Sequence, residues 1–355
     1  MVYYFHVLLY NSNYQAVYKE EEMKKFTKIL MTGLLSAMLL ASCGNSQQNT
    51  DSNNTGSGEA PSGAKKVGVI QLVEHEALDS SYKGFVEGLK EAGFNDGENL
   101  AIDFNNAQGD QSNTTTIAQK LKNDNPDLIF AIATPAAQAV ANQTSEIPIV
   151  VTAVTDPKVA GLVDSNEAPG GNVTGTSDLT PVEDQINLIK EILPEAKRLG
   201  VMYTSSEDNS ILQAEMAKAA GEAAGFEVSE YTVSKTEDIM AVSQSAIGKV
   251  DAIYIPTDNL LAANMTAVSQ ITTPAKIPLI VGEKGMMEQG GLATKGIDYF
   301  ELGKQTGAMA GKILNGEKPA EMPIEYQKES VLYVNQKVAD ELGITLPQSV
   351  LDQAK

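Results

Sequence analysis

Apolar residues along this chain follow two alternating spacings, which predict strands followed by helices. Residues 66–72 form a short apolar run rich in β-branched side chains. Next, apolar residues recur three and four positions apart, which predicts an amphipathic helix that Gly93 ends; these are Tyr82, Phe85, Val86, Leu89 and Ala92. Further short strands are predicted at 100–104, 127–131 and 148–152, and again at 198–203, 227–233, 251–255 and 278–281. Apolar strands that alternate with helices predict an α/β fold with parallel sheets covered on both faces.

The same pattern occurs twice in the chain. Residues 65–69 recur as 197–201, Ala-Gly-Phe at 92–94 recurs at 224–226, and 147–150 matches 277–280. This duplication predicts two Rossmann-like lobes, joined by a hinge, with a cleft between them. We place the first lobe at 64–177 plus 298–324 and the second at 178–297 plus 325–355. The chain crosses near Ser177, before a capping box at 180–183 that opens a helix to Leu193, and again near Ile297, before a helix at 300–314.

The first 63 residues have the pattern of an export signal and a tether. A basic segment at 23–28 precedes a mainly apolar run of 12 residues at 29–40 and then small residues before Cys43, which is typical of a lipoprotein signal peptide. Cys43, the only cysteine, is then the lipidated first residue and membrane anchor, although a buried free thiol is the alternative. Residues 44–63 are polar and predict a flexible tether. Because 1–22 lack signal features, we expect translation to start at Met23 and 1–22 to be untranslated.

Charge and motifs exclude several functions. The formal net charge of -20 is unsuited to nucleic acid, which attracts clustered Lys and Arg. His75 is the only histidine after the signal segment, and no Cys/His cluster, G-x-S-x-G motif or phosphate-binding glycine motif occurs. The sequence therefore predicts a protein that is no enzyme and uses no metal or cofactor.

Five segments together resemble one family of ABC-transporter substrate-binding lipoproteins, several of which are associated with tryptophan or other aromatic amino acids. The segments are 66–69, 133–136, 156–163, 171–177 and 255–259. The resemblance covers nearly all of 65–345. It implies the type I periplasmic-binding-protein fold, in which two hinged lobes close around a small molecule. It also implies an ABC permease as partner and a place on the extracytoplasmic face of a bacterial membrane.

Candidate ligand-binding residues follow the predicted strands, because ligands of open α/β sheets bind beyond the carboxyl ends of the strands. Thr134 opens a helix, whose free N–H groups suit a carboxylate. Asp258 lies seven residues after Asp251, as Thr134 lies seven after Asp127. We therefore expect a zwitterion with its carboxylate at Thr134 and its ammonium at Asp258.

Other polar residues compete for these roles or add to them. Asp156 and Glu283 are alternative partners for the ammonium group. Plain helix N-caps are the alternative roles of Asp79, Thr134, Asp258 and either Asn209 or Ser210. The remaining candidates stand near the same strand ends and are Glu74, Leu78, Pro135, Ala136, Tyr203, Ser205, Glu207, Thr257 and Asn259.

Three functions stay open at this point. The first is a receptor for an aromatic amino acid that serves an ABC importer. The second is the same fold binding a sugar, nucleoside or aliphatic amino acid. The third is a surface adhesin or signalling protein without transport.

Overall fold

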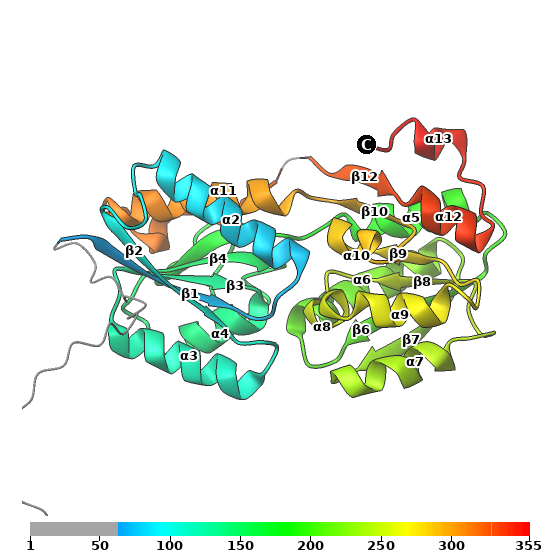
Figure 1. Ribbon diagram of the computed structural model, residues 1–355, viewed down its shortest axis with the longest axis horizontal. Coiled ribbons are helices and arrows are strands. Elements are labelled where there is room, and N and C mark those ends of the chain that lie inside the picture. Colours follow the sequence, from blue (N-terminus) through cyan, green and yellow to red (C-terminus); the bar gives the residue numbers. More distant parts are fainter. Residues whose placement is uncertain (1–62, 328) are drawn as a thin grey trace, which may run out of the picture. The chain divides into compact units, whose positions relative to one another are not determined.

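The computed structural model describes residues 63–327 and 329–355, which form two α/β lobes (Figure 1). The first lobe is built on a six-stranded sheet in the order β11-β5-β4-β3-β1-β2, with every pair parallel. Its strands are β1 (Lys65–Gln71), β2 (Leu100–Asn106), β3 (Leu128–Ile132), β4 (Ile149–Val154), β5 (Val173–Ser177) and β11 (Glu325–Tyr326). The α/β prediction is confirmed.

The second lobe repeats this arrangement in the order β12-β10-β9-β8-β6-β7. Only the edge pair β10–β12 is antiparallel. The strands are β6 (Arg198–Thr204), β7 (Glu227–Val233), β8 (Ala252–Ile255), β9 (Leu279–Val281), β10 (Ala293–Gly296) and β12 (Val331–Val334). The repeated sequence segments 65–69 and 197–201 thus occupy equivalent central strands, β1 and β6.

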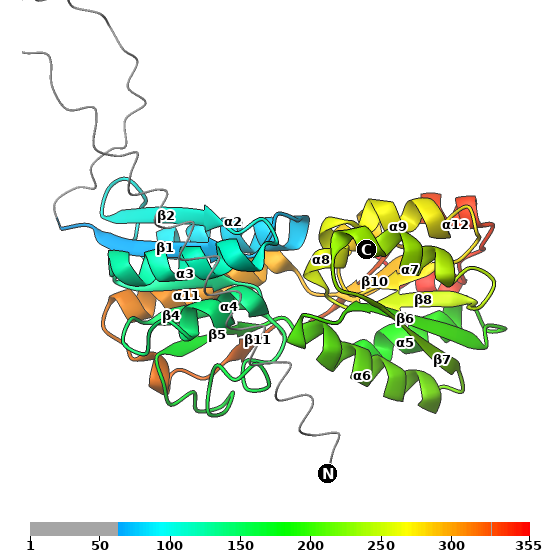
Figure 2. The same cartoon turned by 90° about the horizontal axis from the view of Figure 1, so that it is seen from below.

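Helices cover both faces of each sheet. In the first lobe, α2 and α11 lie side by side on one face, with α3 and α4 on the other (Figure 1). In the second lobe, α7 and α9 lie on the face opposite α6 (Figure 2). The first-lobe helices are α2 (Glu76–Glu91), α3 (Gln111–Asp124), α4 (Thr134–Ala141) and α11 (Tyr299–Leu314). Those of the second lobe are α5 (Val182–Ile192), α6 (Asp208–Ala223), α7 (Ile239–Ser245), α8 (Asn259–Ala263), α9 (Met265–Thr272), α10 (Lys284–Glu288), α12 (Gln336–Leu342) and α13 (Gln348–Leu351).

The predicted amphipathic helix α2 packs its apolar side into the core of the first lobe. Phe85 and Leu89 are fully buried, and the Phe85 ring stacks on Phe130 of β3 with 3.7 Å between ring centroids. The side of α2 that faces α11 lies very close to the backbone of that helix. A Cβ atom added at Gly84 would lie 2.0 Å from the Phe300 carbonyl oxygen, so only glycine fits there.

Three connections join the lobes, after β5, after β10 and after β11. We expected the tail to join the second lobe from Glu325 onward, and this is wrong for β11. Glu325 and Tyr326 pair with Thr176 and Ser177 of β5, and Figure 2 shows β11 close to β5. Only β12 returns to the second sheet. The two-residue strand occupies the free hydrogen-bonding edge of β5, and it is too short to leave a periodic pattern in the sequence.

The predicted capping box at 180–183 is also wrong. The helix α5 begins at Val182, with Pro181 as its N-cap and no side-chain cap. Pro181 has ψ of 77°, outside the helical range, so Thr180 lies one residue too early to cap. The predictions for residues 1–62, including the signal peptide, the tether and Cys43, lie outside the described residues.

Candidate functional site

The lobes meet at the carboxyl ends of their strands, where polar side chains bond across the cleft. Three hydrogen bonds cross it: Gln138 Nε2 to Asp208 Oδ2 at 2.7 Å, Gln213 Nε2 to Thr155 Oγ1 at 3.2 Å, and His75 Nε2 to Asn259 Oδ1 at 3.4 Å. In each pair one residue belongs to the first lobe and the other to the second; the first-lobe residues are Gln138, Thr155 and His75. The described lobes are therefore closed on each other at this point.

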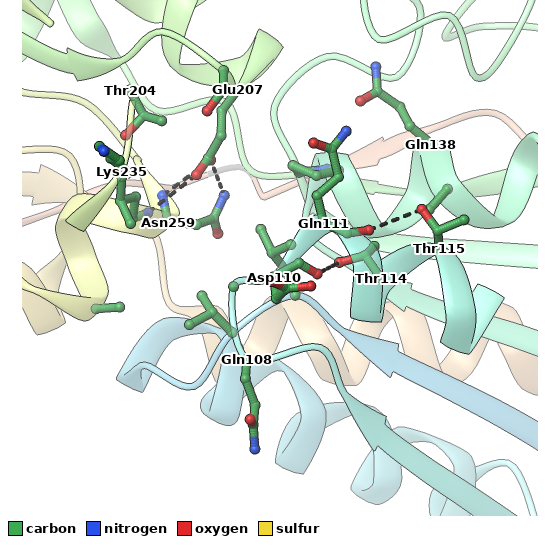
Figure 3. A pocket seen from close by; sticks show the side chains of 18 of the residues that line it. Gln108, Asp110, Gln111, Thr114, Thr115, Gln138, Thr204, Glu207, Lys235 and Asn259 are labelled. Carbon is green, nitrogen blue, oxygen red and sulfur yellow. Dashed lines mark hydrogen bonds between the residues drawn. The ribbon is translucent and has the colours of Figure 1, made fainter. Parts of the chain in front are cut away.

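A small cavity lies between these contacts. Its volume is about 10 Å³, roughly the space of one water molecule, so an amino acid can enter only when the lobes part. Residues from both lobes line it: His75, Leu78, Ala153, Asp178, Asn209, Thr257, Asp258, Asn259, Ala262, Glu283 and Tyr299. Beside it a groove of about 930 Å³ opens between the lobes (Figure 3). In that view Gln138 and Gln111 extend from the first lobe opposite Glu207 and Thr204 of the second.

Buried carboxyl groups dominate the electrostatics of the cavity. Burial raises the pKa of Glu207 and of Glu283 to about 7 each, and the neighbouring Asp258 raises that of Glu207 further. Burial also raises the pKa of Asp178 and of Asp258. Among the described residues that line the cavity there is no Lys or Arg. The site therefore favours a ligand group that carries positive charge.

Asp258 already has protein partners for both of its oxygens. Oδ2 accepts from the Thr204 backbone N–H at 2.6 Å, and Oδ1 accepts from the Thr204 hydroxyl at 2.8 Å. Oδ1 also accepts from the Leu261 N–H, so Asp258 is the N-cap of α8. These bonds join the ends of β6 and β8, which gives the carboxylate a structural task in addition to its place on the cavity wall.

Glu207 and Glu283 hold backbone and side-chain donors in the same region. Glu207 Oε2 accepts from Asn259 Nδ2 at 2.6 Å, which Figure 3 shows as a dashed line. The two oxygens of Glu283 accept from the N–H groups of Gly285 at 2.5 Å and Met286 at 2.7 Å, which caps α10. Thr257 belongs to the same network, since its hydroxyl accepts from Gln213 Nε2 at 2.6 Å.

Thr134 stands at the start of α4 and is not among the residues that line the cavity or the groove. Thr134 is buried, and its hydroxyl oxygen has no hydrogen-bond partner among the described residues. It is residue N1 of α4, not the N-cap, which is Ala133. Ala133 has φ of 85° and ψ of 151°, and Ala153 of the adjacent strand end has φ of 53°. Such strained conformations cluster at functional sites. Pro135 lines the groove and Ala136 is buried.

Several other candidates lie away from the cavity. Glu74 and Ser205 are exposed, and the Tyr203 hydroxyl donates to Glu230 at 3.1 Å. Asp156 accepts from the backbone N–H groups of 158 and 159 and so stabilises its own turn. Asp79 is not an N-cap, because α2 begins at Glu76; it accepts from Gln71 Nε2 at 2.7 Å. Asn209 is not an N-cap either, because the N-cap of α6 is Glu207, two residues earlier.

Three titratable residues on the cavity wall were not among the predicted ligand contacts: His75, Asp178 and Tyr299. His75 was considered only when metal sites and enzyme motifs were excluded, and Asp178 and Tyr299 were placed in the lobes, close to the predicted crossings near Ser177 and Ile297. The Tyr299 hydroxyl donates to Asp178 Oδ2 at 2.7 Å, so two of the connecting segments are bonded to each other beside the cavity. Asp178 and Tyr299 come soon after the ends of β5 and β10, and this position could have identified them as residues near the cleft. Within 63–327 and 329–355, no cluster of metal-ligating side chains occurs and no helix has the length and apolarity needed to cross a membrane.

A profile of the ABC transporter substrate binding protein family matches residues 66–355, about four fifths of the chain. The chain belongs to this family. Its members are extracytoplasmic receptors that bind a small molecule for an ABC transporter, and they are not enzymes. The predicted family, fold and receptor role are thereby confirmed.

Relatives and solved structures agree with this membership. A tyrosine-binding protein of Clostridioides difficile strain R20291 is 40% identical over 313 residues, 88% of this chain and 90% of that protein. An ABC domain from Streptococcus pneumonia in complex with L-Trp is 43% identical, covers 82% of this chain and 98% of its own, and has a TM-score of 0.80. A substrate-binding protein with adhesive properties from Clostridium difficile, in its ligand-free, open structure, is 46% identical with coverages of 82% and 98%, and its TM-score is 0.64.

The two TM-scores differ although the identities are similar. The open structure fits less well than the tryptophan complex, despite its slightly higher identity. Since the lobes share one fold, the difference indicates that the described lobes are arranged more as in the complex. The hydrogen bonds across the cleft fit this closed arrangement.

Proposed function

We propose that this receptor binds an aromatic amino acid in the interlobe cleft and carries a lipid anchor on Cys43. The observation that carries the ligand proposal is the acidic cavity, which lacks any Lys or Arg among its described lining residues and faces both lobes. Two similar proteins are described as tyrosine-binding and as a complex with L-Trp. An α-ammonium group supplies the positive charge that the cavity favours.

The remaining parts of an amino acid also find suitable neighbours. The unpartnered hydroxyl of Thr134 and the free N–H groups at the start of α4 suit the carboxylate. The adjoining groove contributes Leu72, Leu162 and Leu260 to hold an aromatic ring. The ligand's carboxylate therefore faces the first lobe and its ammonium group the buried carboxyl groups, as a zwitterion requires.

Isothermal titration calorimetry of the purified protein tests this function. L-tyrosine, L-tryptophan and L-phenylalanine are the ligands, with L-leucine, glucose and adenosine as controls. We expect saturable binding of at least one aromatic amino acid and none of glucose or adenosine. Binding of a sugar or nucleoside alone would overturn the amino-acid assignment and leave the family membership intact.

Thr134→Val tests the carboxylate position with almost no change of shape. We expect affinity to fall roughly ten- to hundredfold, the usual effect of losing a hydrogen bond to a charged group. Asp258→Ala is less informative, because it also removes the cap of α8 and both bonds from Thr204. Unchanged affinity in Thr134→Val would remove Thr134 from the site.

The lipid anchor has its own test. Cells grown with an alkyne-tagged fatty acid should label the wild-type protein and not the Cys43→Ala variant. Label on the variant, or a mature protein that still contains residues 23–42, would contradict anchoring at Cys43.

A further inference from the structure

A chain of hydrogen bonds in the cavity fixes the orientation of the Asn259 amide. Glu207 Oε2 accepts from the backbone N–H of Asn259 at 3.4 Å. The Asn259 side-chain nitrogen donates to the same oxygen at 2.6 Å. Its Oδ1 atom is consequently directed to the other side, where His75 Nε2 lies at 3.4 Å.

This orientation determines which nitrogen of His75 carries hydrogen. An amide oxygen only accepts, so His75 Nε2 must hold the proton that it donates. Burial lowers the pKa of His75 to about 4, which keeps the ring neutral at neutral pH. A neutral ring with hydrogen on Nε2 has a bare Nδ1, which is an acceptor. Because His75 belongs to the first lobe and Asn259 to the second, closure of the lobes sets this tautomer.

Glu207 orients a second amide in the same way. Asn209 Nδ2 donates to Glu207 Oε2 at 3.4 Å and to the Thr257 carbonyl oxygen at 3.1 Å. The Thr257 oxygen only accepts, so Asn209 Oδ1 must be the free end of the amide. Both Asn209 Oδ1 and His75 Nδ1 are buried and lack a hydrogen-bond partner among the described residues. Both residues line the 10 Å³ cavity.

A buried acceptor without a partner costs free energy, and here two of them border one small space. They come from different lobes, and each is held as an acceptor by the same glutamate. A ligand group that donates two hydrogens satisfies both. An ammonium group has three N–H donors, and the carboxyl groups of Asp178, Asp258 and Glu283 on the same cavity wall balance its charge.

We infer that His75 Nδ1 and Asn209 Oδ1 are a neutral acceptor pair that takes two N–H bonds from the ligand's ammonium group, one from each lobe. Glu207 and Asn259 are the positioning residues that hold this pair in its accepting form. The inference rests on the proposed function and adds His75, a residue that composition and strand position did not select. It also separates two tasks: neutral atoms contact the ammonium group, and the surrounding carboxyl groups supply the field.

Two amide substitutions at His75 test the pair. Glutamine places its amide near the position of Nε2, so His75→Gln keeps a partner for Asn259 and loses the acceptor at Nδ1. Asparagine places its amide near Nδ1, so His75→Asn keeps an acceptor there. Each variant and the wild type are titrated with L-tyrosine and with its des-amino analogue 3-(4-hydroxyphenyl)propanoate. L-tryptophan and indole-3-propanoate are used in parallel.

For the wild type we expect the amino acid to bind more tightly than its des-amino analogue. In His75→Gln the affinity for the amino acid should fall roughly ten- to hundredfold, whereas that for the analogue stays within about twofold. His75→Asn should keep most of the wild-type preference. Equal losses for both ligands would assign His75 a merely structural role, and an unchanged preference in His75→Gln would remove it from ammonium binding. Failure of the wild type to bind any aromatic amino acid would instead refute the proposed function.

Discussion

Replacing Glu283 by glutamine should change how the stability of this protein depends on pH. Glu283 is 3% exposed, and its pKa is raised to about 7, chiefly by burial, against the backbone N–H groups of Gly285 and Met286, which act to lower it. The unfolded chain has an ordinary glutamate pKa of about 4.5. Between these two values the folded protein binds a proton that the unfolded chain has lost. The contribution of Glu283 to stability is therefore fully present below about pH 4.5 and is lost as pH rises through 7.

The size of this effect follows from the shift. A shift of roughly 2.5 pH units corresponds to about 3 kcal/mol of unfolding free energy, which the wild type loses between acidic and neutral pH. Glutamine cannot ionise and escapes this loss. It does, however, have one amide oxygen for two backbone donors, Gly285 and Met286, and leaving one of them unpaired costs about 1–3 kcal/mol. The wild type should thus be more stable at pH 5 and lose this advantage by pH 8.

Urea unfolding at pH 5, 6, 7 and 8, followed by far-ultraviolet circular dichroism, measures the difference. Glu195→Gln, which removes an exposed carboxylate from the same lobe, is the matched control and should follow the wild-type curve. The decisive quantity is the gap between wild type and Glu283→Gln, which should shrink by about 3 kcal/mol from pH 5 to pH 8. Parallel stability curves would show that Glu283 does not titrate as its burial implies.

Three further substitutions have distinct expected results. Gln138→Ala removes the hydrogen bond to Asp208 across the cleft and should lower ligand affinity about two- to tenfold. Small-angle scattering should show a more open ligand-free protein. An unchanged scattering profile and an unchanged affinity would contradict a role of Gln138 in closure. Gly84→Ala should lower the free energy of unfolding by at least about 2 kcal/mol, because its Cβ meets the backbone of α11. Gly171→Ala, whose Cβ faces open space, is the control and should leave the stability unchanged. Equal melting temperatures of the two variants would refute the close packing. Tyr254→Phe leaves buried Gln185 Oε1 without its 2.6 Å donor and should cost about 1–3 kcal/mol in the same melting assay, a loss that would be absent if water replaced the hydroxyl.

The sequence predicted most central strands to within two residues, because their apolar runs are continuous. It missed β5 and β10–β12, whose residues carry weaker signals. In β5, Gly175 has φ of 150° and approaches the Val151 carbonyl so closely that a Cβ would lie 2.1 Å from its oxygen. Glycine is required at 175 because β4 lies against it, and a single sequence does not show this contact. Such a segment looks like a loop when only β-propensity is considered.

The site was predictable in position and less so in detail. The strand-end argument led to Asp258, Glu207, Asn209, Asn259 and Glu283, which the structure brings together. It could not show that Asp258 and Glu283 already bond to backbone donors, because both helix starts are formed by the fold. Nor could it select His75, whose bonding partner lies 184 residues away in the other lobe. Which oxygen or nitrogen stays free depends on every other bond around it.

The return of the chain to both sheets has a consequence for synthesis of the protein. The core of the first lobe includes Leu302, Met309 and Ile313 of α11, and that of the second includes Leu332 and Val338. A growing chain that has reached residue 298 therefore has neither core complete: each sheet lacks one edge strand, and α11 does not yet cover the first sheet. Both cores become complete only when the last sixth of the chain emerges. The order of translation thus favours folding as one late event, with both lobes finished almost together.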